Sequence, residues 1–387
     1  MNNDGNIVAV CPIAKRLGIP KFEPIFKIRN LLEQHNVVLR SSNYELYAHI
    51  SRQMMNTIAR YCDNSYVYSI DECFGEFTDF TKIISDWYRY GHQIRRAVWK
   101  ECRMPVGVGF GPTLTLAKAA NHASKKLPGA DGVACIDDEH SRIGILRQMS
   151  LTDVWGVGSR LSNKLAATGV KNAYELSKLS PKRIRSEFSV VLERTINELN
   201  GMQCLTWNNV REAKKQIFST HSFGKRVNKR NALKQALSSH VDKVVFKSSE
   251  QCSLIKKLVI FASNSPHDEH FYSQSVKIEF PNGTGSLLTI CNALDKAIDK
   301  IFHPNVNFYR CGVGAIELVS KTHFQPDLFL PAENTAVMDC YAKINQRFGA
   351  GTIKNAASTG TGEWKMRREH LSNRYTSSWA DIPRIRC

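Results

Sequence analysis

Between residues 214 and 320 the apolar residues recur in an order that few folds can satisfy. The expected elements are, in chain order, a strand over 216–227, a helix over 231–249, strands over 254–262 and 272–280, a helix over 286–302 and a strand over 308–319. This β-α-β-β-α-β order predicts a compact sheet with two helices on one of its faces.

The chain before residue 135 alternates helical and strand patterns, which is typical of an α/β layer fold. A short strand is expected over 7–10, helices over 44–61, 79–101 and 116–126, and a buried strand with two glycines over 104–110. Residues 150–210 have a helical and polar pattern. After residue 320 the pattern of regular secondary structure becomes weaker. With 387 residues, 42% of them hydrophobic, the chain is predicted to be an α/β multidomain protein of two to four domains.

Residues 68–74, Tyr-Ser-Ile-Asp-Glu-Cys-Phe, place two adjacent carboxylates in an apolar and aromatic stretch that predicts a buried strand. Burying Asp71 and Glu72 is costly unless a cation neutralises them. Magnesium takes oxygen ligands and leaves places for substrate phosphates, so the pair suits phosphoryl transfer by two metal ions. An exposed hairpin turn is an equally good interpretation of the pair alone, because adjacent acids are common and a strand would point them to opposite faces.

The charge balance favours a polyanionic partner. Fifty-three Lys and Arg against 35 Asp and Glu give a net charge of +18 and a pI near 9.5, which suits nucleic acid. With no apolar run near 18 residues, no signal peptide and no lipidation signal, we expect a soluble, cytoplasmic chain rather than a membrane-bound one. Eleven scattered cysteines without a Cys-x-x-Cys pair argue against a zinc site and a disulfide framework, and for reduced thiols.

The sequence Val-Trp-Gly-Val-Gly at 154–158, followed by Leu161 and Leu165, has the spacing of a helix-hairpin-helix. Gly156 and Gly158 would allow a tight turn, and the amides that open the following helix would face a DNA phosphate without reading bases. The alternative is an ordinary glycine turn between two packed helices.

Basic residues favour phosphate contacts at two further places. In the 116–126 helix, Lys118 and Lys125 lie two turns apart on nearly one face, although either could be an ordinary surface lysine. Residues 211–257 hold 12 Lys or Arg and 3 Asp or Glu, so 12 − 3 = +9, and include Lys225 and Arg226. This density indicates a surface that follows a DNA backbone rather than merely a solvated face.

The peptide Gln-Pro-Asp-Leu-Phe at 325–329 lies in a proline-flanked linker and could dock its leucine and phenylalanine in a partner's pocket. Most such short strings carry no function. A helix is expected over 333–349, and the segment 363–374 is basic, with aromatic residues near it, as in a docking segment.

Together these motifs resemble the Y-family translesion DNA polymerases, most closely the UmuC-type catalytic subunit of DNA polymerase V. The similarity extends along essentially the whole chain, including Ser-Ser-Asn-Tyr-Glu-Leu-Tyr at 41–47 and Val-Leu-Glu-Arg-Thr at 191–195. The resemblance implies the right-handed polymerase fold in four parts: palm and fingers over 1–150, N-terminally incomplete, a helix-hairpin-helix thumb over 151–210, a little finger over 211–320, and a clamp-binding peptide with a UmuC-type tail over 321–387.

The same resemblance implies error-prone, template-directed DNA synthesis past damaged bases as part of SOS-type DNA repair. It also implies two Mg²⁺ ions, dNTP and damaged primer-template DNA as ligands, and a UmuD-type accessory dimer, RecA and the β sliding clamp as partners. The implied site residues are Asp71 and Glu72 for metal and catalysis, Lys15 and Lys125 for the incoming nucleotide, and Gln325, Leu328 and Phe329 for the clamp. The expected DNA contacts at Gly156, Gly158, Lys225 and Arg226 come from the turn spacing and the charge density instead.

One departure from the family pattern lies at the N-terminus. Family members begin with a strand-containing segment of about thirty further residues, which brings the first metal-binding aspartate and an aromatic steric gate. Asp4 aligns with a later loop and is no substitute. We expect a start upstream of Met1 rather than a natural variant. The alternative function is a noncatalytic DNA- and clamp-binding subunit that lacks this aspartate.

Overall fold

The computed structural model describes residues 1–206, 213–322, 329, 336–349, 351–359, 364–376, 378–383 and 385. The chain divides into two compact units, each considered by itself below. The first unit comprises Met1–Ser42 and Ala213–Asn373, and the second comprises Asn43–Glu212 and Arg374–Cys387. Across the described ranges, no helix is both long and apolar enough to cross a membrane. The four-part division inferred from the sequence stays a prediction.

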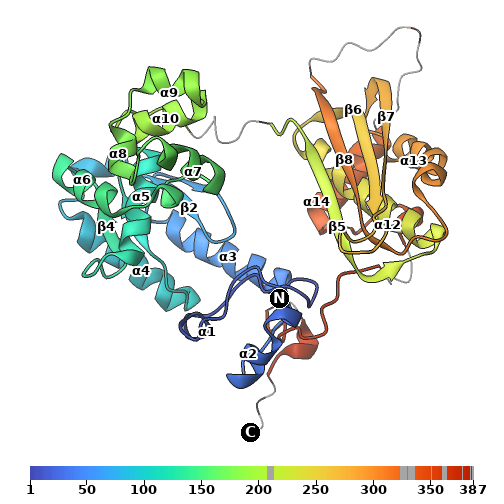
Figure 1. Ribbon diagram of the computed structural model, residues 1–387, viewed down its shortest axis with the longest axis horizontal. Coiled ribbons are helices and arrows are strands. Elements are labelled where there is room, and N and C mark those ends of the chain that lie inside the picture. The colour runs from blue at the N-terminus through green and yellow to red at the C-terminus, as the bar shows by residue number, and fades with distance from the viewer. Residues whose placement is uncertain are drawn as a thin grey trace. The chain divides into compact units, whose positions relative to one another are not determined.

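The first unit contains a four-stranded antiparallel sheet covered on one face by helices. Figure 1 shows α12 (Arg230–Glu250) and α13 (Leu287–Ile301) against this sheet, whose strand order is β5-β8-β6-β7. The strands are β5 (Ile217–Val227), β6 (Ser253–Ser263), β7 (Ser273–Thr284) and β8 (Phe308–Ser320). The predicted β-α-β-β-α-β order is therefore confirmed.

Alternation of apolar residues along the strands produces the core beneath the helices. In β6, Leu258, Ile260 and Ala262 are fully buried, as are Val313 in β8 and Leu294 in α13. A register shift near the start of β6 breaks the alternation once, against both neighbouring strands. Burial of the larger of these side chains, Leu, Ile and Val, at about 1.5–3 kcal/mol each, is the main stabilising term for the sheet.

A buried histidine in this core makes the stability of the first unit depend on pH. His240 of α12 is 1% exposed, and its Nδ1 lies 2.8 Å from the hydroxyl oxygen of Ser219 on β5. The pKa of His240 is lowered to about 3, mainly by burial and further by the charge of Lys243 and by the neighbouring His221. Burial also lowers the pKa of His221.

We expect the first unit to lose stability as the pH falls from about 6.5 toward 3. In this range His240 binds a proton in the unfolded state but stays neutral in the folded state. The slope for one such group is about 1.4 kcal/mol per pH unit. Hydrogen exchange of α12 amides, corrected for intrinsic rates, should show a shallower slope in His240→Gln. His270→Gln, an exposed histidine of the same unit, should keep the original slope. Equal slopes in all three proteins would contradict this origin.

The N-terminal part of the first unit has a small core of its own. It contains α1 (Pro12–Arg16) and α2 (Arg29–Gln34), and Ile7, Ile19 and Leu32 are nearly fully buried. The strand expected over 7–10 does not form. Ile7 exchanges backbone hydrogen bonds with Phe22 and Glu23, but no continuous ladder follows.

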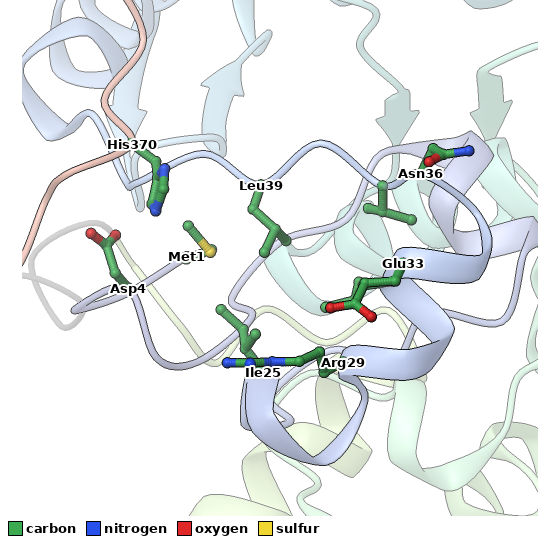
Figure 2. Close-up of a pocket in the computed structure, with 10 residues that line it drawn as sticks. Met1, Asp4, Ile25, Arg29, Glu33, Asn36, Leu39 and His370 are labelled. Atoms are coloured by element: carbon green, nitrogen blue, oxygen red, sulfur yellow. The ribbon is translucent and has the colours of Figure 1, made fainter.

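The C-terminal tail joins this N-terminal part through hydrogen bonds. The Ser41 amide donates to the His370 carbonyl at 2.9 Å, and the His370 amide donates to the Ser41 hydroxyl at 2.9 Å. The Asp4 carboxylate accepts from the Ser41 hydroxyl at 2.6 Å and from the Glu369 amide at 2.7 Å. Figure 2 shows His370 facing the pocket that Met1 and Asp4 also line. Hydrogen bonds to both backbone and side-chain groups therefore hold the end of the tail segment 364–370 in place.

A glycine in β5 makes room for the same tail segment. A Cβ on Gly224 would lie 2.6 Å from the Lys365 carbonyl oxygen and 3.0 Å from the Arg367 amide nitrogen. We expect Gly224→Ala to push the tail away and to speed tryptic cleavage after Lys365 or Arg367 severalfold. Gly144→Ala is the matched control, because a Cβ there meets nothing within 4 Å. Identical cleavage of both variants would show that the tail does not depend on this contact.

The second unit begins with a layer of helices on short strands. Its elements are α3 (Tyr44–Ala59), the antiparallel hairpin β1 (Asn64–Val67) and β2 (Cys73–Glu76), α4 (Trp87–Cys102), the parallel pair β3 (Val108–Phe110) and β4 (Val133–Cys135), and α5 (Leu114–Lys126). Val98, Leu116 and Val133 are fully buried.

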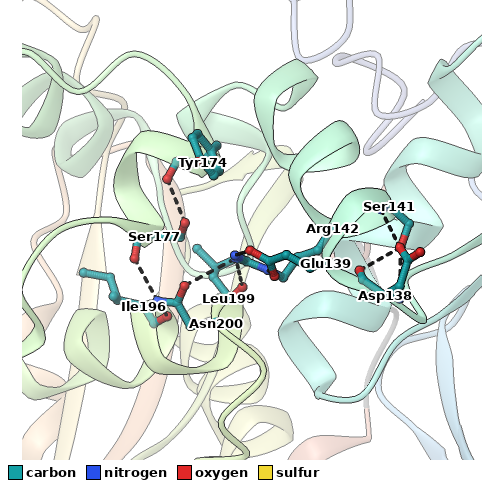
Figure 3. Close-up of polar contacts among 9 residues, drawn as sticks. All are labelled: Asp138, Glu139, Ser141, Arg142, Tyr174, Ser177, Ile196, Leu199 and Asn200. Carbon is teal, nitrogen blue, oxygen red and sulfur yellow. Dashed lines mark hydrogen bonds and ion pairs between the residues drawn. The ribbon is translucent and has the colours of Figure 1, made fainter.

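Residues 139–199 of the second unit form five helices, α6 (Glu139–Gln148), α7 (Ser159–Ala167), α8 (Ala173–Ser177), α9 (Pro181–Glu187) and α10 (Val190–Leu199). Figure 3 shows how a buried guanidinium and the side-chain amide of Asn200 together connect three of these helices. Arg142 of α6, 7% exposed, donates to the Leu199 carbonyl at 2.9 Å and to Asn200 Oδ1 at 3.3 Å. Asn200 Nδ2 in turn donates to the Ser177 carbonyl at 2.7 Å. The helix ends are satisfied by side chains, as buried ends require.

Candidate active site

The two adjacent carboxylates lie on the loop of the β1–β2 hairpin. Val67 pairs with Cys73, so residues 68–72 form the connection, and the amides of Tyr68 and Ser69 both donate to the Glu72 carbonyl at 3.0 Å. Asp71 is exposed. The predicted buried strand is therefore wrong, and the alternative hairpin turn is correct.

Glu72 is paired with a lysine from helix α5. Lys118 Nζ lies 2.6 Å from Glu72 Oε1, and the two side chains are 21% and 34% exposed. The ammonium also lies 5.6 Å from the centre of the Tyr68 ring. Asp71 Oδ1 accepts a hydrogen bond of 2.6 Å from the Ser69 hydroxyl. One carboxylate of the pair thus already faces a cation.

Two glycines allow α5 to lie close enough for this contact. A Cβ on Gly109 of β3 would overlap the backbone nitrogen of Asn121, and a Cβ on Gly107 would lie 2.8 Å from Lys125 Cε. The helix begins at a Thr113 cap whose hydroxyl accepts from the Leu116 amide at 3.2 Å. The glycines of the predicted 104–110 strand therefore position both lysines of the helix.

A pocket of about 590 Å³ brings most of the predicted residues of the second unit together. Its lining includes Glu72, Lys118 and Lys125, and the loop that carries Gly156 and Gly158. Gly156 has φ +87°, a left-handed conformation that favours glycine. The N-cap residue of α7 is Gly158, which has no side chain to accept hydrogen bonds from the first amides of the helix. This arrangement offers basic groups and helix amides to phosphate.

An aromatic contact links the hairpin to the glycine loop and was not predicted. Trp155 Nε1 donates to the Tyr68 hydroxyl at 3.1 Å, and the two rings meet edge to face at 5.5 Å. Phe74 of β2 also contacts Trp155, with ring centres 5.6 Å apart. Tyr68 and Trp155 each lie inside a motif noted in the sequence, but only the folded structure shows that the two motifs touch.

The other predicted nucleotide and DNA residues belong to the first unit. Lys15 lies exposed in the last turn of α1. Lys225 and Arg226 are exposed near the end of β5. Arg226 donates two hydrogen bonds to Asp268, at 2.7 and 3.0 Å, and these lower the pKa of that carboxyl.

The structure describes only one residue of the predicted clamp peptide, Phe329. Phe329 is 96% exposed. Gln325 and Leu328 lie outside the described residues.

Two adjacent carboxylates on a loop match the oxygen ligands that magnesium prefers. The close approach of Lys118 to Glu72 shows that a cation is compatible with this position. Throughout the described part of the chain, no group of three or more His, Cys, Asp or Glu side chains is placed to hold a metal ion. The pair therefore fits an ion that takes one or two protein carboxylates and fills its other positions with water and substrate phosphates.

Comparison with known proteins identifies the family. The family model described as impB/mucB/samB matches residues 1–122, its C-terminal domain model matches residues 214–328, and a domain of unknown function matches residues 335–385. Protein UmuC of Salmonella typhimurium is 36% identical over 392 residues, covering 100% of this chain and 93% of that protein. The chain belongs to the impB/mucB/samB family. Protein MucB of Escherichia coli is 33% identical, with 99% and 91% covered.

Membership makes the chain a UmuC-type Y-family polymerase, that is, a DNA-directed DNA polymerase of translesion synthesis and SOS-type repair. A solved Y-family DNA polymerase chimera has the same fold, with a TM-score of 0.56 at 16% identity, covering 79% of this chain and 86% of that chain. The family resemblance and the α/β polymerase fold predicted from the sequence are confirmed.

Proposed function

We propose that this polymerase transfers nucleotides with two magnesium ions held by Asp71 and Glu72. The observation that carries the proposal is the pocket in which Glu72, Lys118 and Lys125 converge with the glycine loop. Family membership supplies the reaction, in which the primer 3′ oxygen attacks the α-phosphate of a dNTP and pyrophosphate leaves. When bound, magnesium would neutralise the phosphates and polarise the reacting centre.

The residues of the chain bind and orient the substrate in this proposal. Lys125, held beside Gly107, contributes positive charge toward the triphosphate. The nucleotide contact of Lys15 rests on the family resemblance alone. Fixed positive charge at transferring phosphates stabilises the developing negative charge. Asp71 and Glu72 contribute the two carboxylates, and Lys118 orients one of them.

Lys118 restrains Glu72 through the 2.6 Å ion pair, so the hairpin loop is attached to α5 through a side chain that is only 21% exposed. The Tyr68–Trp155 hydrogen bond attaches the same loop to the segment before α7. Positioning of this kind accounts for large parts of enzymatic rate enhancement. We assign Lys118 to holding Glu72 and not to the chemistry itself.

Contacts to DNA are proposed at the opening of α7 and on β5. The α7 amides beyond Gly158 suit a backbone phosphate, and Lys225 and Arg226 lie exposed on β5. The net charge of +18 supports such contacts. Exposure of Phe329 supports sliding-clamp binding through Gln325, Leu328 and Phe329. The family points to a UmuD-type dimer and RecA as further partners, and to the cytoplasm as the location.

The test is primer extension on a template with one abasic site, with the UmuD-type dimer, RecA and the clamp added. We expect magnesium-dependent products that extend beyond the lesion. Copying of an undamaged template with a complete stop at the abasic site would contradict translesion synthesis. Absence of products on both templates would contradict the polymerase activity itself.

A further inference from the structure

Helix α4 of the second unit carries a row of basic side chains on its exposed face. At about 3.6 residues per turn, Arg89, Arg96 and Lys100 lie within about 40° of one another around the helix axis, opposite the buried Val98. Arg103 follows at the C-cap. These four basic residues are all exposed, and we call them the α4 stripe. From its first residue to its last, the stripe extends about 21 Å along the axis.

The positive charge of the α4 stripe is not compensated within the chain. Among the residues that the structure describes, none forms a hydrogen bond or an ion pair with the side chain of a stripe residue. Glu101, the one acidic residue within α4, is paired with Arg60 instead. Like charges three or four residues apart on a helix repel each other, as at Arg96, Lys100 and Arg103. Binding of an anion would relieve this repulsion.

The α4 stripe lies on the far side of a sheet from the candidate active site. A Cβ on Gly91 of α4 would lie 3.1 Å from Phe110 Cε2 of β3, whereas a Cβ on the preceding strand residue, Gly109, would overlap the backbone of α5 at Asn121. Successive residues of a strand point to opposite faces, so α4 and α5 cover opposite faces of the β3–β4 pair. The lysines of the candidate active site belong to α5. The stripe, on the outer side of α4, therefore faces away from them.

An exposed tryptophan accompanies the stripe. Trp99 immediately precedes Lys100 and is 50% exposed. Tryptophan is normally among the more buried side chains, because its ring contributes a large apolar area. An accessible indole beside lysine and arginine side chains is the combination that single-stranded nucleic acid requires, with bases stacked on the ring and phosphates on the cations.

We infer that this face of α4 is a second nucleic-acid site, which binds a single DNA strand with its phosphates along the α4 stripe and an unpaired base on Trp99. Stacking on one ring is indifferent to sequence, and neutralising the phosphates releases counterions, so binding should depend on salt and not on base identity. The inference goes beyond the proposed function, because neither the reaction nor the proposed primer-template contacts use α4.

The test photocross-links labelled oligothymidylate to the full chain after unlabelled dideoxy-terminated primer-template and the matching dNTP have filled the polymerase site. Mass spectrometry of the peptides then locates the cross-links. We expect one at Trp99. Arg96→Gln combined with Lys100→Gln and Arg103→Gln should lower its yield about tenfold, and should reduce the slope of log binding against log salt by about 2, because three phosphate contacts are lost.

A matched control removes the same number of charges elsewhere in the second unit. Lys182→Gln combined with Arg183→Gln and Arg185→Gln neutralises three exposed residues of α9 and should keep the cross-link at Trp99. The α4 variant should extend a primer on a short undamaged template like the wild type. Asp71→Asn should lose extension but keep the cross-link, so failure of the proposed catalytic function is distinguishable.

Two results would overturn the inference at once, namely no cross-link at Trp99 in the wild type and an equal yield in the α4 variant. Polyglutamate at the same concentration of charge provides a further comparison. It should displace the strand poorly, because it offers no base to the indole. Displacement as effective as that by unlabelled oligothymidylate would assign this face to an acidic protein and would also overturn the inference.

Discussion

Replacing Asp71 by asparagine is expected to lower the rate of primer extension about 10³-fold, equivalent to about 4 kcal/mol of transition-state stabilisation. The amide keeps the size of the side chain but loses the negative charge that a divalent ion requires. Asp71 lies exposed on the 68–72 loop, so the fold should be unaffected. The measurement is the single-turnover rate at saturating dNTP and magnesium on an undamaged template.

Asp137→Asn provides the matched control, because Asp137 is an exposed aspartate of the same unit just before α6. It should leave the rate unchanged, and both variants should bind primer-template DNA like the wild type. An Asp71→Asn rate within a few-fold of the wild type would show that the carboxylate does not take part in the chemistry.

Glu198→Ala is expected to destabilise the second unit by about 4 kcal/mol, because it leaves buried donors without a partner. Glu198 is fully buried at the end of α10. Its Oε2 accepts from the amide and hydroxyl of Thr115, both at 2.9 Å. Its Oε1 accepts from the amides of Cys204 and Leu205, again both at 2.9 Å. One carboxylate therefore anchors the first turn of α5 and the segment after α10.

The loss should appear as faster hydrogen exchange in α5 and a lower thermal midpoint. Primer extension should fall too, because α5 carries Lys118 and Lys125. Glu187→Ala removes a surface partner of Arg183 at 2.7 Å and should cost less than about 0.5 kcal/mol. Equal midpoints for Glu198→Ala and Glu187→Ala would mean that the buried network contributes little.

Local periodicity was sufficient to predict the sheet and its helices in the first unit. Strands with alternating apolar residues and helices with a buried face leave the same signal in any context. The signal failed at residues 68–74, where Tyr68 and Ile70 look like core residues but are 41% and 51% exposed. Only three residues of the predicted 104–110 strand pair with a neighbour, as β3.

The contacts that build the candidate site were beyond the reach of sequence patterns. Lys118 and Glu72 are 46 residues apart, and Trp155 and Tyr68 are 87 apart, so neither pair leaves a periodic trace. In the sequence, nothing distinguishes Glu198 from the other acidic residues of a polar helix. In the structure it is fully buried and is a central hydrogen-bond acceptor. The motif glycines were informative because backbone approach and left-handed φ values restrict the residue type locally.

The assignment of Asp71 and Glu72 as metal carboxylates is tested most directly by counting bound ions. Electron paramagnetic resonance can measure Mn²⁺ bound per chain in a complex with a dideoxy-terminated primer-template and the matching dNTP, where turnover cannot occur. The wild type should bind more Mn²⁺ per chain than Asp71→Asn combined with Glu72→Gln. The same stoichiometry and affinity in both proteins would contradict the assignment and place the ions on other groups.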